Sequence, residues 1–341
     1  MNTEDVRELL RSVEDPELGD DIVSLNLVNS IDWEDEETVH ISLALGAPYS
    51  PSETAIANRV RETLAEEGIT AELSAHVPDS GSEVLPNVEN VIAVSSGKGG
   101  VGKSTVSVNL AAGLADRGAR VGLFDADIYG PNVPRMVDAD QHPQATEDET
   151  IVPPEKYGMK LMSMAFMVGE DDPVIWRGPM VHKVLTQLIE DVEWGHLDYL
   201  IVDLPPGTGD TQLTMLQTMP LTGSVVVTTP QQVAIDDARK GLQMFGRHDT
   251  PVLGITENMS TFRCPDCGGE HDIFGSGGGE QFAEENDLPF LGKIPLDPSV
   301  RAGGDEGKPI VLDQDSDVGG AFRELSGNVA NMAGIIRRQQ L

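Results

Sequence analysis

The sequence Val94-Ser-Ser-Gly97-Lys98-Gly99-Gly100-Val101-Gly102-Lys103-Ser104-Thr105 decides the fold and the first functional prediction. It contains a glycine, four further residues and then Gly-Lys-Ser, which is the spacing of a phosphate-binding P-loop. The apolar run before it predicts a buried strand, and the residues after it predict a helix over 104–117. A glycine-rich loop between a strand and a helix is typical of a nucleotide site.

Each part of this loop has a physical role in binding phosphate. Glycines let the backbone wrap so that its N–H groups face phosphate oxygens, and the following helix adds the positive end of its dipole. Lys103 is expected to reach the β and γ phosphates, and the Ser104 hydroxyl to bind Mg²⁺. The residues expected to surround the phosphates are Gly97, Lys98, Gly99, Gly100, Val101, Gly102, Lys103, Ser104 and Thr105.

Strands alternate with helices from residue 87 onward. Nearly continuous apolar or β-branched runs are typical of buried parallel strands that helices cover. The predicted strands are 90–95, 120–124, 198–203, 223–228, 251–256 and 289–294, with helices such as 104–117 and 234–245 between them. This order predicts a doubly wound α/β domain with a mostly parallel sheet over residues 89–341. We interpret the polar, acidic residues 138–158 as an insertion or a mobile loop.

A smaller domain is predicted ahead of it, over residues 1–76. A first helix carries the apolar residues Val6, Leu9, Leu10 and Val13, and the turn Asp15-Pro16-Glu17 follows it. The remaining elements are expected to be strands at 22–28, 38–45 and 69–75 and a helix at 52–66. The order α-β-β-α-β indicates a small α+β domain, and residues 77–88, rich in Pro, Ser and Gly, are predicted to be a linker.

The charge of the chain excludes some partners. Its 341 residues include 23 Lys+Arg and 57 Asp+Glu, for a formal net charge of −34. A surface this negative repels phosphate backbones, and we therefore expect no nucleic-acid partner. Because acidic residues are spread over the whole chain, the composition also suggests a halophilic protein from a high-salt cytoplasm. The sequence has no run of 18 apolar residues and no basic and apolar leader, so we expect a cytoplasmic protein and no membrane partner.

Two cysteines, Cys264 and Cys267, are the only ones in the chain. The Cys-x-x-Cys spacing puts two thiolates on one tight turn, as metal or iron–sulfur ligation requires. Two thiolates are half a set, so either another residue such as His271 completes the site or a two-fold dimer brings two pairs together. A zinc knuckle and a thioredoxin-like redox pair remain alternatives.

Acidic residues stand at the ends of two predicted strands. Asp125 and Asp127 follow the strand at 120–124, and Asp203 ends the strand at 198–203, before Leu-Pro-Pro-Gly207. The carboxyl ends of parallel strands meet at the edge of the sheet where a P-loop also lies. These carboxylates are therefore expected beside the phosphates, although each could also cap a helix.

The loop as a whole resembles the deviant P-loop of the MinD/ParA/nitrogenase-iron-protein class. The stretch GKGGVGKST has an extra lysine, Lys98, directly after its first glycine. In that class this lysine crosses a dimer interface to the partner's nucleotide. The resemblance therefore implies an ATPase that forms a homodimer with ATP sandwiched between its subunits.

The same resemblance implies roles for the acidic residues and their neighbours. Asp127 would orient the attacking water, and Asp125 would lie near the Mg²⁺ shell. Asp203 would hold Mg²⁺, usually through water, and the backbone of Gly207 would sense the γ-phosphate. Asn258, after the strand at 251–256, resembles the residue that reads adenine in this class.

Further motifs narrow the resemblance to the Mrp/ApbC family of P-loop ATPases that carry iron–sulfur clusters. They are FDADIYGPN, WRGPM (176–180), DLPPGTGD, TTPQ (228–231), ENMS (257–260), the CPxC pair and IPLDPSVR (294–301). The N-terminal segment resembles the small iron–sulfur assembly domain that is often fused ahead of this ATPase, but it contains no cysteine.

The resemblance implies a carrier that binds and hydrolyses ATP with Mg²⁺, holds a [4Fe-4S] cluster between two subunits through Cys264 and Cys267, and delivers it to apo-proteins. Other cluster assembly factors would be its partners. A MinD/ParA-type positioning ATPase shares the P-loop and Lys98, but gives the cysteine pair no role. A zinc-stabilised ATPase scaffold is the third alternative.

Overall fold

The structure is a computed structural model of the 341-residue chain. It describes all residues except 1, 36, 76–83, 129, 149, 168–177, 265 and 340–341, and it does not describe the side chains of residues 178, 179, 181 and 210. Most of the predicted linker and of the WRGPM motif therefore lies outside the described residues.

The chain divides into two compact units. The first consists of residues 1–80 together with 330–341, and the second of residues 81–329. The sequence had placed residues 330–341 in the ATPase domain, so the structure differs from the prediction at the end of the chain.

The second unit is built on a mostly parallel sheet, as predicted. Its described strands follow the order β13-β12-β11-β4-β10-β5-β9-β8, with β14 beside β12. All neighbours pair in parallel except β12 with β13 and β8 with β9. The strands are β4 (Val88–Ser96), β5 (Val121–Asp125), β8 (Glu155–Lys156), β9 (Met159–Ser163), β10 (Leu197–Asp203), β11 (Gly223–Thr228), β12 (Val252–Arg263), β13 (Glu270–His271) and β14 (Phe290–Leu296).

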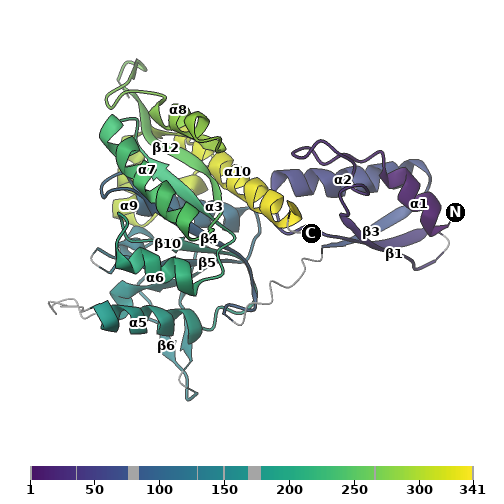
Figure 1. Ribbon diagram of the computed structural model, residues 1–341, viewed down its shortest axis with the longest axis horizontal. Coiled ribbons are helices and arrows are strands. Elements are labelled where there is room, and N and C mark those ends of the chain that lie inside the picture. The colour runs from purple at the N-terminus through teal and green to yellow at the C-terminus, as the bar shows by residue number, and fades with distance from the viewer. Residues whose placement is uncertain are drawn as a thin grey trace. The chain divides into compact units, whose positions relative to one another are not determined.

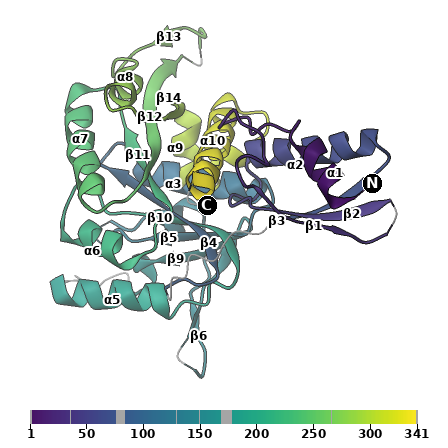
Figure 2. The same ribbon diagram turned by 45° about the vertical axis from the view of Figure 1, so that its right-hand side comes forward.

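Helices cover both faces of this sheet, which makes the fold doubly wound (Figure 1, Figure 2). α5, α6 and α7 lie on one face and α3 on the other. The helices are α3 (Lys103–Asp116), α4 (Val133–Met136), η1 (Met164–Met167), α5 (Gly178–Glu190), α6 (Asp210–Thr218), α7 (Gln232–Arg247), α8 (Gly278–Glu285), α9 (Pro298–Glu306), η2 (Ile310–Leu312) and α10 (Asp317–Gln339).

The register of the central strands brings the predicted site together. β4 lies between β10 and β11, and the P-loop follows it directly. On β10, Asp203 is the register partner of Val94 on one side and of Asp125 on the other. The strand ends therefore place both carboxylates beside the phosphate-binding loop.

The first unit contains α1 (Thr3–Leu10), β1 (Val28–Trp33), β2 (Thr38–Leu43), α2 (Pro51–Glu66) and β3 (Thr70–Ala75), followed by residues 330–339 of α10. The predicted order α-β-β-α-β is confirmed. β2 pairs antiparallel with β1 and parallel with β3, and the apolar side chains of α1, α2 and the strands form one core.

The predicted strand at 22–28 is wrong, because β1 begins only at Val28. The Asp21 carboxylate accepts hydrogen bonds from the backbone N–H groups of Val23 and Ser24, and Asn26 has a φ of 57°. Such local side-chain bonds stabilise a turn at the expense of a strand. Ile22 is nevertheless buried, so its apolar character was a sign of the core and not of a strand.

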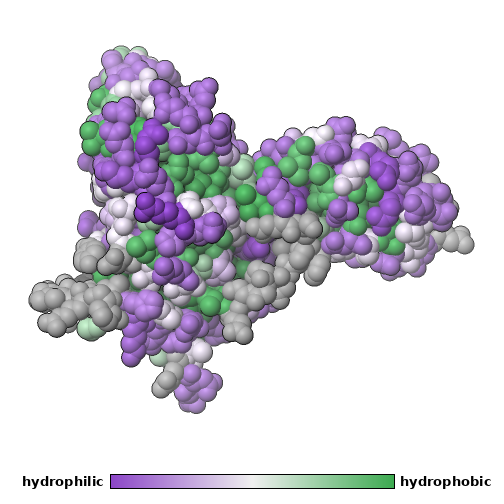
Figure 3. Space-filling view, viewed as in Figure 1, coloured by the Kyte–Doolittle hydropathy of each residue, from purple (hydrophilic) through white to green (hydrophobic). Residues whose placement is uncertain are grey.

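Residues 138–158 contain more structure than a loop. β6 (Gln144–Ala145) and β7 (Ile151–Val152) pair as a small hairpin, and β8 leads into β9, a parallel strand beside β5 that the sequence had not indicated. On the face drawn in Figure 3, hydrophilic residues cover much of the surface of each unit. Among the described residues, no helix combines the length and apolarity needed to cross a membrane.

Candidate nucleotide site and cysteine hairpin

The P-loop needs glycine at particular positions. Gly100 and Gly102 have φ angles of 83° and 82°, in the left-handed region that side chains disfavour. Gly97 passes so close to α7 that a Cβ atom there would lie 2.1 Å from the backbone carbon of Asp237. These glycines shape a loop whose backbone is free of side chains at Gly97, Gly100 and Gly102, so a ligand could approach it closely.

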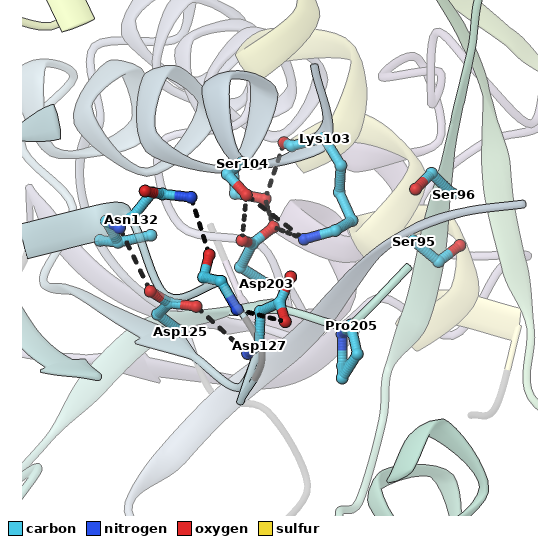
Figure 4. Close-up of polar contacts among 12 residues, drawn as sticks. Ser95, Ser96, Lys103, Ser104, Asp125, Asp127, Asn132, Asp203 and Pro205 are labelled. Carbon is cyan, nitrogen blue, oxygen red and sulfur yellow. Dashed lines mark hydrogen bonds and ion pairs between the residues drawn. The ribbon is translucent and has the colours of Figure 1, made fainter. Parts of the chain in front are cut away.

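Lys103 and Ser104, the first residues of α3, converge on Asp203 (Figure 4). The Lys103 Nζ lies 2.6 Å from Asp203 Oδ1, and the Ser104 hydroxyl donates to Oδ2 at 2.6 Å. Ser107, one turn further along α3, donates to Oδ1, also at 2.6 Å. Lys103 and Asp203 are both buried, so the two charges of this ion pair face each other away from water.

Asp125 lies beside this pair at the end of β5. Its carboxylate accepts hydrogen bonds from the backbone N–H groups of Asp127 and Val133 and from the Ser163 hydroxyl, at 3.2, 3.2 and 3.0 Å. Burial, and next the negative charge of Asp203, raise the pKa of Asp125 to about 7. Two adjacent buried carboxylates, of which only Asp203 forms an ion pair with Lys103 among the described residues, are suited to a further cation.

The oxygen atoms at this place fit Mg²⁺, which prefers carboxylate and hydroxyl oxygens. Asp125, Asp203 and Ser104 supply such oxygens from three elements that meet at one sheet edge. Burial, and next the charge of Asp203, raise the pKa of Asp125, and a divalent cation beside the two carboxylates would favour their charged forms.

Asp127 and Gly207 lie on the two loops that follow β5 and β10. Asp127 accepts from the Gly130 backbone N–H at 3.2 Å and is half-buried in the wall of the cavity described next. Gly207 has a φ of 91°, and its N–H donates to the Ser96 carbonyl at 3.0 Å. Asp127 shares a cavity wall with P-loop residues, and Gly207 contacts the end of the strand that leads into the P-loop. Tyr129 in the Asp127 loop lies outside the described residues.

A cavity of about 580 Å³ opens beside the P-loop, a size typical of small-molecule sites. It is lined by P-loop residues including Lys98, Lys103, Ser104 and Thr105, and by Asp127 and Asn258. Asn258 donates to the Val101 carbonyl at 2.8 Å, which fixes its side chain against the loop. The opposite wall comes from the β14–α9 segment, which includes Pro295, Asp297 and Arg301.

The structure also shows residues that the sequence did not single out. Ser107 and Ser163 bind the two carboxylates, and Arg135 and Arg301 line the cavity. Ser107 is four residues after Lys103, so helical spacing could have revealed it. Ser163 could not be found because it ends β9, the strand that the sequence did not indicate.

Cys264 and Cys267 lie in the turn between β12 and β13. The Cys264 N–H donates to the Gly269 carbonyl at 2.8 Å and the Gly268 N–H to the Cys264 carbonyl at 2.9 Å, which closes the turn. Both thiols are free and Cys267 is exposed. Hydrogen bonds from the backbone of Cys267 and then of Asp266 lower the pKa of the Cys264 thiol.

No third Cys, His, Asp or Glu joins this pair in a metal-binding group among the residues that the structure describes. His271 instead stacks near Phe262 on the neighbouring strand, with ring centroids 6.5 Å apart. The sequence offered two ways to complete the metal site, and the first was that His271 joins the two thiols. The structure does not group His271 with the thiols in this way. Pro265 lies outside the described residues.

One strand joins the two sites. β12 carries Asn258 in the wall of the nucleotide cavity and ends at Arg263, directly before Cys264. Between them, Met259 has a φ of 54° and the pairing with β14 shifts register between Asn258 and Phe262. A bulge of this kind bends a strand and re-aims the residues beyond it.

The doubly wound sheet, the P-loop and the carboxylates at the neighbouring strand ends define a P-loop NTPase. Residues 87–330 match the family described as "NUBPL iron-transfer P-loop NTPase", and residues 3–71 match the family described as "Iron-sulfur cluster assembly protein". The "Iron-sulfur cluster carrier protein" of Synechocystis is 46% identical over 327 residues, which cover 92% of each chain. The chain therefore belongs to the iron–sulfur cluster carrier family of P-loop NTPases, as its motifs indicated.

Solved structures agree with the P-loop NTPase fold. A nucleotide-binding protein from Archaeoglobus fulgidus in complex with ADP is 36% identical, with a TM-score of 0.60, and the match covers 69% of this chain and 93% of that one. The cell division ATPase MinD of Pyrococcus furiosus, 23% identical, matches with a TM-score of 0.54 over 71% of this chain and 98% of that one. The second likeness concerns the fold alone.

Proposed function

We propose that this protein binds and hydrolyses ATP, holds a [4Fe-4S] cluster between two copies of the chain, and transfers the cluster to apo-proteins. One observation carries the proposal: β12 runs from the wall of the nucleotide cavity directly into the hairpin of Cys264 and Cys267. A single strand thus provides a physical connection between the state of the nucleotide and the place of the cargo.

The nucleotide part of the reaction rests on the P-loop. The backbone N–H groups of residues 97–105 and the Lys103 ammonium bind the phosphates, and Asn258 faces the adenine. When ATP binds, the Gly207 N–H would exchange the Ser96 carbonyl, its acceptor in this structure, for the γ-phosphate. Asp127 would then orient a water molecule whose oxygen forms a bond to the γ phosphorus while the bond from that phosphorus to ADP breaks, and the water proton passes to the released phosphate.

Ser104, Asp203 and Asp125 would hold Mg²⁺, directly or through water, and the ion would supply positive charge against the phosphates. In this arrangement Ser107 orients the Asp203 carboxylate and Ser163 orients Asp125, since both hydroxyls donate to these carboxylates.

The dimer follows from Lys98 and from the number of thiols. Within the described residues, the Lys98 side chain has no ion-pair partner although the chain carries a net charge of −34. In a sandwich dimer it would reach the phosphates of the partner's nucleotide. The same two-fold axis would bring two Cys264–Cys267 pairs together, which completes four thiolates for one cluster.

The bulge in β12 gives nucleotide a way to affect the cluster. Asn258 stands on one side of the bulge and the cysteines on the other. A movement of Asn258 when nucleotide binds would change the strand beyond Met259, and with it the distance between the two thiol pairs. Binding and hydrolysis would thereby switch the dimer between holding and releasing its cargo.

The test is anaerobic reconstitution with iron and sulfide, followed by the visible spectrum and by iron and sulfide analysis per dimer. We expect about four irons and four sulfides per dimer in the wild type and a loss of both in Cys264→Ala and Cys267→Ala. The proposal fails if the wild type takes up no iron, or if either cysteine variant binds as much as the wild type.

His271→Ala is the matched control, because it removes a ligand-type side chain on the same hairpin. This variant is expected to bind the cluster normally. A loss of metal in this variant, together with zinc instead of iron in protein purified without air, would support the zinc site. Transfer is measured separately, as activation of an apo-protein by the loaded carrier with and without ATP.

A further inference from the structure

The end of the C-terminal helix forms a buried polar contact inside the first unit. Residues 330–339 of α10 belong to this unit, and the Arg338 side chain is completely buried there. Its Nη1 lies 2.8 Å from Glu53 Oε1 and its Nε lies 2.9 Å from Asp15 Oδ2. The contact with Asp15 is an ion pair and not a hydrogen bond, because Asp15 Oδ2 and Arg338 Nε have no hydrogen-bond partner among the described residues.

The two carboxylates that receive Arg338 are themselves held in place. Glu53 accepts hydrogen bonds from the backbone N–H groups of Gly46 and Ala47 at 3.1 and 3.0 Å. Asp15 accepts from the N–H groups of Glu17 and Leu18 through its other oxygen, at 2.9 and 3.2 Å. The site is thus built from the Asp15-Pro16-Glu17 turn, the loop after β2 and the start of α2.

Two further positions on the same face of α10 fit this site. Asn331 accepts from the Ser52 N–H and hydroxyl at 3.0 and 2.9 Å, and it donates to Glu17 Oε1 at 3.0 Å. At Gly334, a Cβ atom would lie 2.7 Å from Glu53 Oε1 and 3.2 Å from the Ala47 Cβ, so only glycine allows this approach. Positions 331, 334 and 338 are three and four residues apart, which places them on one helical face.

Burial makes this contact selective. A guanidinium offers several donors in a fixed fork and can bridge two carboxylates, whereas a lysine ammonium is a single point. If Arg338 is removed, Asp15 and Glu53 remain buried beside each other without a cation, which is strongly unfavourable. A helix without arginine at this position, or without glycine one turn earlier, therefore fits less well.

We propose that the N-terminal domain is a receptor for an arginine-bearing helix, and that residues 331–338 of the same chain are its occupant. The Asp-Pro-Glu turn of this cysteine-free domain therefore recognises a helix and does not ligate a cluster. The contacts of Asn331 and Arg338 agree with the grouping of residues 330–341 with this domain.

The test is amide hydrogen exchange of the full chain, with Arg338→Ala, Arg338→Lys and, as a control, Gln339→Ala, which shortens an exposed neighbouring side chain. In Arg338→Ala, we expect exchange at the amides of Gly46, Ala47, Glu17 and Leu18 to rise by about tenfold or more, with β1 and β2 unchanged. Arg338→Lys is expected to restore part of the protection, and Gln339→Ala to behave as the wild type.

A second experiment adds the segment back. The full-length Arg338→Ala chain is mixed with an excess of a synthetic peptide of residues 328–341, and the same amides are followed. Protection that returns with this peptide, but not with its Arg338→Ala form, supports the receptor. Unchanged exchange in Arg338→Ala, or a uniform rise across residues 2–75, overturns the proposal, as does equal protection by both peptides.

Discussion

The substitution Asp125→Asn tests the charge arrangement at the nucleotide site. Asp125 is buried next to Asp203, and Lys103 forms an ion pair with Asp203. Asparagine has nearly the same shape but no charge. In protein without nucleotide and metal, the substitution should therefore remove a repulsion that grows as the pH rises.

The sign and size of the effect follow from the pKa of Asp125. Folding raises this pKa from 3.8 to about 7, first through burial and then through the charge of Asp203. Between these pH values the folded state binds more protons than the unfolded state, so the free energy of unfolding falls as the pH rises. One pKa unit corresponds to about 1.4 kcal/mol, so the wild type should lose about 3 kcal/mol between pH 5 and pH 8 from this group.

The Asp125→Asn variant has no carboxyl group at this position, so its free energy of unfolding should not fall in this way between pH 5 and pH 8. The free energy of unfolding of the variant minus that of the wild type should thus become more positive by about 3 kcal/mol from pH 5 to pH 8. At pH 5 the variant is expected to be slightly less stable, because an amide offers fewer acceptors to the N–H groups of Asp127 and Val133.

The assay is amide hydrogen exchange of peptides that cover β5 and β10, with a chelator present and with intrinsic rates corrected for pH. Asp148→Asn, a change of the same kind at an exposed carboxylate, is the control and should show no trend. A difference between variant and wild type that stays flat from pH 5 to pH 8, or decreases, would refute the reasoning.

Three further changes test the loop, the adenine side and the thiols. Gly97→Ala should reduce the affinity for a fluorescent ATP analogue by about tenfold or more, because its Cβ would overlap the backbone of Asp237; unchanged affinity would contradict this. Asn258→Asp places an acceptor against the Val101 carbonyl and should weaken ADP binding by about tenfold in calorimetry. In Cys267→Ser, which keeps the backbone N–H, the pH midpoint for alkylation of Cys264 should lie below that of an ordinary thiol, because backbone hydrogen bonds lower its pKa.

Much of the fold could be predicted because its signals are local. The apolar run before the P-loop and the run over 223–228 are long and β-branched, and both became strands of the parallel sheet. By contrast, β9 has the sequence Met-Lys-Leu-Met-Ser, which has no strand pattern of its own. Its strand conformation comes from pairing with β5, a contact that a single sequence does not contain.

The candidate site also has a part that the sequence could predict and a part that it could not. The P-loop residues and the carboxylates at strand ends follow from the rule that parallel strands present their carboxyl ends at one edge. Which hydroxyl orients which carboxylate depends on three-dimensional packing, so Ser163 was missed. The role of the Asp15-Pro16-Glu17 turn was hidden for a similar reason, since Arg338 lies more than 300 residues away in the chain.

The ion pair of Lys103 with Asp203 explains why nucleotide and a divalent cation should bind together. In this structure, Lys103 neutralises Asp203, and neither side chain is free for a ligand. A phosphate that attracts Lys103 leaves Asp203 and Asp125 as two buried carboxylates without a nearby cation, which is unfavourable. A divalent cation that arrives with the phosphate removes this penalty, so each ligand should bind more tightly in the presence of the other.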